Sequence, residues 1–204
     1  MEQGVSVDEV RSELSQLGAG AGNGTDAFSS WELDTLVDHI IATHHAYVKE
    51  AIPILIAHTQ KVASVHGARH EELIRIRDGY REVAEEMTQH MMKEELMLFP
   101  YIKALARSAR TGEPLRIPPF QTIRNPIRMM EAEHVSAGNG TDLIRKESAG
   151  YTIPADACTT YRITYQELEA FEQDLHKHVH LENNILFPKA VELERTLFAS
   201  GRTV

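Results

Sequence analysis

The sequence predicts an all-α protein that folds as an up-down-up-down four-helix bundle. Apolar residues recur at helical spacing in four long segments, and loops rich in glycine or proline separate these segments. No segment alternates between apolar and polar residues over a useful length, so we expect no β-sheet. A chain of 204 residues can bury one sizeable core. These observations indicate one bundle domain, which we assign to residues 31–200.

The N-terminal residues 1–30 are expected to form a flexible arm or linker, because a run of glycine and alanine occupies residues 18–24. The first helix should begin near Ser29, where the sequence Ser-Ser-Trp-Glu has the pattern of a capping box. Pro53 is expected to kink this helix and not to end it, because the apolar pattern continues beyond it.

The other three helices are bounded by turn signals. The second should run from about Arg69 to Leu98, with a continuation beyond Pro100 to Ala109 left open, before a proline-rich connection over residues 111–125. The third should open with Asn125 as its N-cap, followed by a proline, and run to about residue 146. The fourth should start at Pro154 and run through residue 187, with a continuation to 197 left open.

The most informative feature is a repeated motif, His-x-x-x-Glu-x-x-x-Leu-Phe-Pro. It begins at His90 and again at His178, which is 88 positions later (178 − 90). Residues four apart lie on one helix face, so each copy directs an imidazole and a carboxylate, Glu94 or Glu182, to the same place. One such pair alone is more often a solvated pair on the surface. The repetition favours a metal site over a purely structural bundle.

The duplication extends to two more histidines. His45 precedes His90 by 45 residues (90 − 45), and His134 precedes His178 by 44 (178 − 134). Each helix pair therefore supplies one histidine and one copy of the motif. Four imidazoles and two bridging carboxylates suit two iron ions, with an oxo or hydroxo bridge between them and one position open on each. The predicted ligands are His45, His90, Glu94, His134, His178 and Glu182.

Other residues near the motif are weaker candidates. Glu86 and Glu133 could orient a ligand histidine, and Gly138, one turn after His134, could leave room for a small ligand. His66 lies 21 residues (66 − 45) beyond His45, roughly 31 Å along one helix, which is too far for the same metal centre. The histidines beside the ligands should face away from the metals; these are His39, His44, His176 and His180.

Composition narrows the functional classes. The net charge of −9 gives no basis for a nucleic-acid or anionic-membrane surface, and no apolar run reaches membrane-spanning length. Cys158 is the only cysteine, so neither an internal disulfide nor a cysteine-ligated cluster is possible within one chain. We expect a cytoplasmic protein.

The residues that surround these positions resemble the hemerythrin-like domain, and more narrowly the repair-of-iron-centres family of di-iron proteins. The resemblance covers most of residues 32–192. It implies that the six residues above are iron ligands, that His66 matches a histidine of the family, and that Glu86 and Glu133 occupy acidic positions near the centre. The stretches that carry it are Asp38–Ile41, His45, His90–Glu95, Leu98–Pro100, Met130–His134, Ala157–Thr160 and Leu181–Pro188.

The resemblance implies repair or protection of iron–sulfur clusters damaged by nitrosative or oxidative stress, with iron donation as one route. Damaged iron–sulfur proteins would be partners, and nitric oxide or dioxygen would be ligands of a monomer or homodimer. Two departures matter. Residues 1–30 lack the cysteine pair of an N-terminal domain that family members often carry, and Gly138 stands where oxygen-carrying hemerythrins have a histidine.

Three alternatives stay open: an enzyme that reduces nitric oxide or nitrite, an oxygen-binding or oxygen-sensing module, and a ferritin-like protein. The ferritin-like class needs Glu-x-x-His on two helices. Only Glu131–His134 has that spacing, because Leu175 takes the glutamate's place in the fourth helix.

Overall fold

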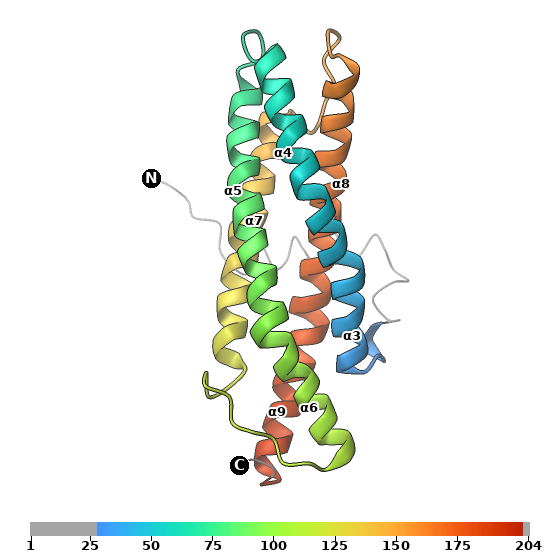
Figure 1. Ribbon diagram of the computed structural model, residues 1–204, viewed down its shortest axis with the longest axis vertical. Coiled ribbons are helices and arrows are strands. Elements are labelled where there is room, and N and C mark those ends of the chain that lie inside the picture. The colour runs from blue at the N-terminus through green and yellow to red at the C-terminus, as the bar shows by residue number, and fades with distance from the viewer. Residues whose placement is uncertain (1–27, 202–204) are drawn as a thin grey trace.

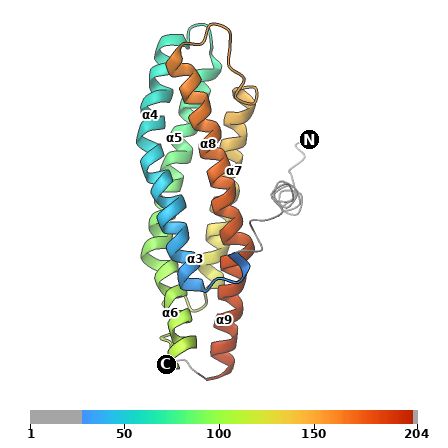
Figure 2. The ribbon, with the colours of Figure 1, turned by 90° about the vertical axis from the view of Figure 1, so that its right-hand side faces the viewer.

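Four long antiparallel helical rods form the structure, a computed structural model that describes residues 28–201 (Figures 1 and 2). Every element in this part of the chain is a helix. The predicted all-α, up-down-up-down bundle is therefore confirmed. Short π-helical segments, labelled η, interrupt three of the rods. In chain order the elements are α3 (Leu33–Ile40), η1 (Ile41–His45), α4 (Ala46–His66), α5 (Glu72–Lys93), η2 (Glu94–Leu98), α6 (Phe99–Thr111), α7 (Arg124–Glu147), α8 (Thr159–Leu181), η3 (Glu182–Leu186) and α9 (Phe187–Ala199).

Prolines do not end the rods. Pro53 lies inside α4, and Pro100 and Pro188 lie in the first turns of α6 and α9, directly after η2 and η3, so the rods run through all three prolines. The second and fourth rods therefore continue to Thr111 and Ala199, slightly beyond the continuations left open above.

Three predicted helix starts are wrong. No capping box forms, because α3 begins at Leu33 after a separate turn in which the Trp31 N–H bonds the Phe28 carbonyl at 3.1 Å. The third rod starts at Arg124, two residues before the proline predicted to open it, and the Asn125 side chain donates to the Phe120 carbonyl instead of capping the helix. The fourth rod starts after Cys158 and not at Pro154, whose carbonyl accepts a turn hydrogen bond from Ala157.

The π segments each add one residue to a helical turn. In η2 and η3 the N–H of the following phenylalanine, Phe99 or Phe187, bonds a carbonyl five residues earlier, at Glu94 or Glu182. π-Bulges of this kind occur frequently at functional sites. All three lie at the same height of the bundle, and each contains a predicted metal ligand at one end: His45, Glu94 or Glu182.

The apolar core divides into two clusters along the long axis. One lies among α3, α6, α9 and the start of α7, and includes Ile40 and Leu98. The other lies among α4, α5, α7 and α8, and includes Val48 and Met91. The predicted ligands occupy the sequence positions between these clusters. They form a polar layer that both apolar clusters shield from water.

A buried carboxylate anchors the connection that leads into α7. Glu194 of α9 is 4% exposed and accepts hydrogen bonds from the Tyr101 hydroxyl at 2.9 Å, the Thr122 hydroxyl at 2.6 Å and the Ile123 N–H at 2.9 Å. These bonds offset the cost of burying its charge. They also fix where α7 begins, and so the height of His134.

The predicted N-terminal arm falls mostly outside the described residues. Within them, Phe28 packs against Trp31 with ring centroids 4.9 Å apart. Phe28 also packs against the core cluster that lies among α3, α6, α9 and the start of α7. Among residues 28–201 no helix combines the length and apolar character needed to cross a membrane.

Candidate metal centre

The six predicted ligands converge in the middle of the bundle, and every rod contributes at least one. His45 ends η1, His90 and Glu94 come from α5 and η2, His134 comes from α7, and His178 and Glu182 come from α8 and η3. All six are at most 4% exposed. Four histidines and two glutamates so deeply buried require partners, because an isolated buried charge is costly.

The histidines face each other in two pairs. The Nε2 atoms of His45 and His178 are 3.2 Å apart, and those of His90 and His134 are 3.0 Å apart. Two imidazole nitrogens that each ligate one metal at about 2.0–2.1 Å can lie at such a separation. Each pair therefore presents its lone pairs to one point.

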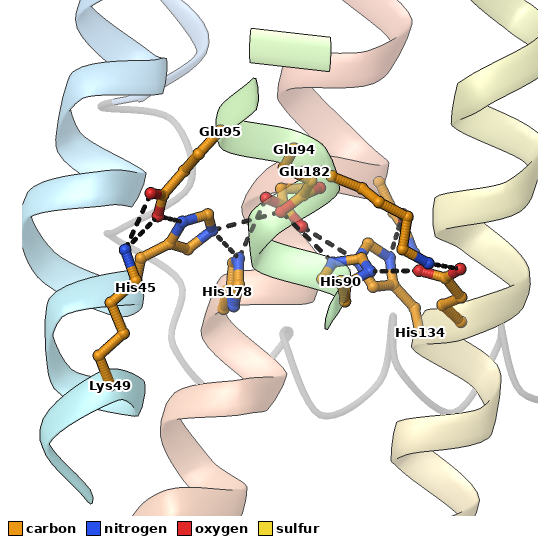
Figure 3. Close-up of polar contacts among 11 residues, drawn as sticks. His45, Lys49, His90, Glu94, Glu95, His134, His178 and Glu182 are labelled. Atoms are coloured by element: carbon orange, nitrogen blue, oxygen red, sulfur yellow. Dashed lines mark hydrogen bonds and ion pairs between the residues drawn. The ribbon is translucent and has the colours of Figure 1, made fainter. Parts of the chain in front are cut away.

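The two carboxylates lie between these pairs and touch both (Figure 3). One oxygen of Glu94, Oε2, is 3.3 Å from Nε2 of His45 and 3.3 Å from Nε2 of His90. Glu182 uses both oxygens: Oε1 is 3.0 Å from Nε2 of His178, and Oε2 is 3.1 Å from Nε2 of His134. Each glutamate can therefore bridge two metal positions.

The donor atoms form two groups that share both carboxylates. One group is His45, His178, Glu94 and Glu182; the other is His90, His134, Glu94 and Glu182, and the ligand atoms of each group lie within 4.8 Å of one another. Both oxygens of Glu94 and Oε2 of Glu182 are buried without a hydrogen-bond partner among the described residues. Unsatisfied anionic oxygens beside imidazole nitrogens fit a cation. The site can thus hold a di-iron centre, and iron is the expected metal.

In the metal-free protein, bound protons compensate the negative charge of the buried carboxylates. Burial opposes the charged form of His90, but attraction to Glu94 and Glu182 and the hydrogen bond to Glu133 outweigh it and raise the pKa of His90 to about 9. Burial likewise opposes the Glu182 anion, but His178 and His134 hold the pKa of its carboxyl well below the usual range. Metal binding must therefore displace the proton of His90.

Three ligand histidines are oriented through their second ring nitrogen, Nδ1. That of His45 is 2.7 Å from Glu95, which is itself 2.6 Å from the Lys49 ammonium. The arrangement repeats at His90, whose Nδ1 is 3.0 Å from Glu133, and Glu133 also bonds Lys93. These contacts fix the ring orientations, as carboxylates commonly do behind metal-binding histidines.

The third oriented ring is His134, whose Nδ1 is 2.9 Å from the amide oxygen of Asn183. His178 differs: its Nδ1 is buried with no hydrogen-bond partner in the described part of the chain. Its ring stacks instead on His44, with centroids 5.6 Å apart and planes inclined by 2°.

The four weaker candidates lie at different distances from the six ligands. Glu133 lies behind His90, as described above, whereas Glu86 bonds the Ser136 hydroxyl at 2.9 Å on the surface and reaches none of the six ligands. A Cβ on Gly138 would meet nothing within 4 Å, so there is open space beside it. His66 lies at the far end of α4, with Nε2 3.2 Å from Cys158 Sγ and away from the six ligands.

Sequence reasoning missed three residues that contact the ligands: Glu95, Asn183 and His44. Glu95 and Asn183 each follow a motif glutamate directly, a signal visible in both copies of the motif. His44 was expected to face away from the metals, which is wrong in one respect: it is 5% exposed and stacks against His178. The π turn of η1 explains this, because it rotates the residue before His45 toward α8.

Fold and site together define a four-helix protein with a buried cluster of histidines and glutamates that can hold two metal ions. The chain belongs to the family of the hemerythrin HHE cation-binding domain, which matches residues 36–190. Relatives include a probable iron–sulfur cluster repair protein of Haemophilus influenzae, 33% identical over 191 residues that cover 93% of this chain and 80% of the relative. The iron–sulfur cluster repair protein YtfE of Yersinia pestis and that of Yersinia pseudotuberculosis are each 33% identical over 190 residues, with the same coverage.

Proposed function

We propose that this protein repairs iron–sulfur clusters damaged by nitrosative or oxidative stress, and that it uses a di-iron centre to do so. Relatives that match 93% of the chain are iron–sulfur cluster repair proteins by name. The observation that carries the proposal to this chain is the pair of buried carboxylates, each of which touches both histidine pairs. Damaged iron–sulfur proteins are the proposed partners.

The proposed ligands are the six residues that the sequence singled out. His45 and His178 would hold one iron, His90 and His134 the other, and Glu94 and Glu182 would bridge them. Bound iron would supply redox chemistry, an affinity for small oxidants, and a store of metal for a damaged cluster. Glu95, Glu133 and Asn183 would keep the imidazoles aligned while iron enters or leaves.

Depth of burial supports protection of the metal more than rapid exchange with solvent. The ligand layer lies between two apolar clusters, and His45, His178, Glu94 and Glu182 are each 0% exposed. The open space at Gly138 is the opening that we propose for a small ligand. A cytoplasmic setting, and a monomer or homodimer, remain our predictions for the working protein.

The proposal is tested by following labelled iron. Protein loaded with ⁵⁷Fe is incubated with a cluster enzyme inactivated by nitric oxide, and both recovered activity and transferred label are measured. We expect activity to return as label moves from the bundle to the enzyme. Recovered activity without transferred label would contradict donation, and no recovery would contradict repair.

Two variants make this test specific. His90→Ala removes a proposed ligand and should abolish both label transfer and recovery. His58→Gln is the matched control, because His58 is a helical histidine paired with a carboxylate, Glu167 at 2.6 Å, away from the six ligands. Catalytic consumption of nitric oxide over many turnovers would favour an enzyme instead, and reversible dioxygen binding would favour a carrier.

A further inference from the structure

The second ring nitrogen of His178 is the exception among the ligand histidines. Nδ1 of His45, His90 and His134 has an oxygen partner, respectively on Glu95, Glu133 and Asn183, at 2.7–3.0 Å. Nδ1 of His178 has none among the described residues, although the ring is 0% exposed. A buried polar group without a partner costs roughly 1–3 kcal/mol, so this nitrogen calls for an explanation.

Metal binding by His178 determines whether its Nδ1 needs a hydrogen-bond acceptor or a donor. In the proposed centre Nε2 of His178 faces the metal, because it lies 3.0 Å from Glu182 and 3.2 Å from Nε2 of His45. A neutral imidazole that ligates through Nε2 carries its proton on Nδ1. The loaded protein therefore has a buried N–H donor at this position, and such donors almost always meet a carboxylate, a carbonyl or water.

A matching acceptor lies one helical turn earlier. Asp174 precedes His178 by four residues on α8, and this spacing places both side chains on one face of the helix. One carboxylate oxygen of Asp174, Oδ2, is also buried without a hydrogen-bond partner in the described chain. An unsatisfied acceptor and an unsatisfied donor thus occur on the same side of the same rod.

The other oxygen of Asp174 already holds a second imidazole. Asp174 Oδ1 is 2.9 Å from Nδ1 of His44, and the His44 side chain is only 6% exposed. The rings of His44 and His178 are parallel, with planes 2° apart and centroids 5.6 Å apart. The His178 ring therefore stacks on a ring that Asp174 already holds, one helical turn from the free oxygen of that carboxylate.

We propose that Asp174 is the positioning residue for His178, and that its two oxygens hold His44 and His178 as a parallel pair in the metal-loaded protein. The proposal rests on the di-iron centre proposed above. It completes a set in which each of the four ligand histidines has an Nδ1 acceptor. Asp174 differs from Glu95 and Glu133 in its other contact: they bond Lys49 and Lys93, whereas Asp174 bonds an imidazole.

The test uses the reduced, iron-loaded protein and its proton NMR spectrum. Nδ1 protons of histidines bound to paramagnetic iron give strongly shifted signals that disappear in heavy water as they exchange. Wild-type protein should give four such signals, one from each ligand histidine. Asp174→Ala should lose one of them, or make it exchange at least about 10-fold faster, while the other three remain.

Two further variants keep the test specific. Asp174→Asn retains an oxygen that can accept from His178, so it should restore the fourth signal at a changed shift. Glu167→Ala is the matched control: Glu167 bonds His58 at 2.6 Å between the same two rods, α4 and α8, so the variant also breaks a histidine–carboxylate pair. It should retain all four signals.

A second readout is the release of iron to a strong chelator. Loss of a partner behind a metal ligand typically weakens metal binding 10–100-fold. Asp174→Ala should therefore release iron at least about 10-fold faster, and Glu167→Ala should match wild type. Four unchanged signals with wild-type release in Asp174→Ala would overturn the proposal, as would an equal effect of Glu167→Ala.

The outcomes separate this proposal from the proposed function. Wild-type protein that binds no iron would overturn both. Four signals in the wild type that persist in Asp174→Ala would overturn the role of Asp174 alone. The expected signals together with no repair of damaged clusters would overturn the function and leave Asp174 as the positioning residue.

Discussion

Glu182 Oε2 lies 3.1 Å from His134 Nε2, which joins the fourth rod to the third at the level of the proposed metals. The one-turn spacing in the sequence explains only the other contact of this carboxylate, with His178. Because both residues are at most 4% exposed, their interaction is little weakened by water. In the metal-free protein, bound protons must take the place of the metal charge in this layer. The stability of that form therefore depends on pH.

Metal-free protein should lose stability as the pH rises from about 6.5 to 9. The pKa of His90 is raised from 6.5 to about 9, so its stabilising proton is bound below the unfolded value and lost as pH passes the folded value. Glu182 has the opposite sign: its lowered pKa stabilises the fold above the unfolded value, 4.5, and this contribution is lost in acid. Thermal unfolding of metal-free protein between pH 6.5 and 9 measures the first effect, and thermal unfolding below pH 4.5 measures the second.

Iron-loaded protein is the control for that experiment. Iron would replace the proton on His90, so loaded protein should show no comparable fall in melting temperature between pH 6.5 and 9. Equal pH profiles for loaded and metal-free protein would show that the proton on His90 does not stabilise the metal-free fold.

Two glycines of α7 should respond oppositely to alanine. Gly138→Ala meets open space, so the higher helix propensity of alanine should stabilise the protein by up to about 1 kcal/mol. A Cβ on Gly140 would lie 2.4 Å from Cγ2 of Val83, which is 2% exposed on α5. Overpacking of this kind costs about 1–3 kcal/mol, so Gly140→Ala should be destabilising.

Denaturant unfolding of the two single variants measures this difference. The double variant Gly140→Ala/Val83→Ala checks the cause, because removing Cγ2 removes the contact. Its loss of stability should be smaller than the sum of the two single losses by at least about 0.5 kcal/mol. Simple additivity would show that contact with Val83 is not the reason for a glycine at position 140.

Much of the fold could be predicted because the signals were local and repeated. Helical periodicity and the loop residues indicated four rods, and the Leu-Phe-Pro of each motif supplies Leu98 and Leu186, which are both 0% exposed. Helix starts were less predictable. The Ser29 to Glu32 pattern suits a capping box, but packing of Phe28 and Trp31 on the core fixes a separate turn there.

The six proposed ligands could be found from sequence because they recur at matched distances along the chain. The groups behind them could not, since they depend on contacts between rods. His44 shows why: an ideal helix directs it away from His45, whereas the π turn of η1 brings it beside His178. Nothing in a single sequence marks a π turn. The need for glycine at position 140 could not be predicted either, because it depends on contact with Val83 on another rod.

Glu133→Gln should loosen iron without unfolding the protein. Glu133 is 3.0 Å from Nδ1 of His90 and also bonds Lys93, so the variant weakens the orientation of one proposed ligand. We expect about 10-fold faster release of iron to a chelator. Glu131→Gln on the same helix is the control, because Glu131 is exposed. Equal rates for the two variants would show that Glu133 does not support the metal.

Glu94 and Glu182 are proposed to bridge two irons in one centre, and counting iron tests this most directly. Protein produced with ample iron is measured by elemental analysis, and Mössbauer spectroscopy reports whether the irons are magnetically coupled. We predict about two coupled irons per chain, and far fewer in Glu94→Gln and Glu182→Gln. One uncoupled iron per chain, or two irons retained in both variants, would contradict the account.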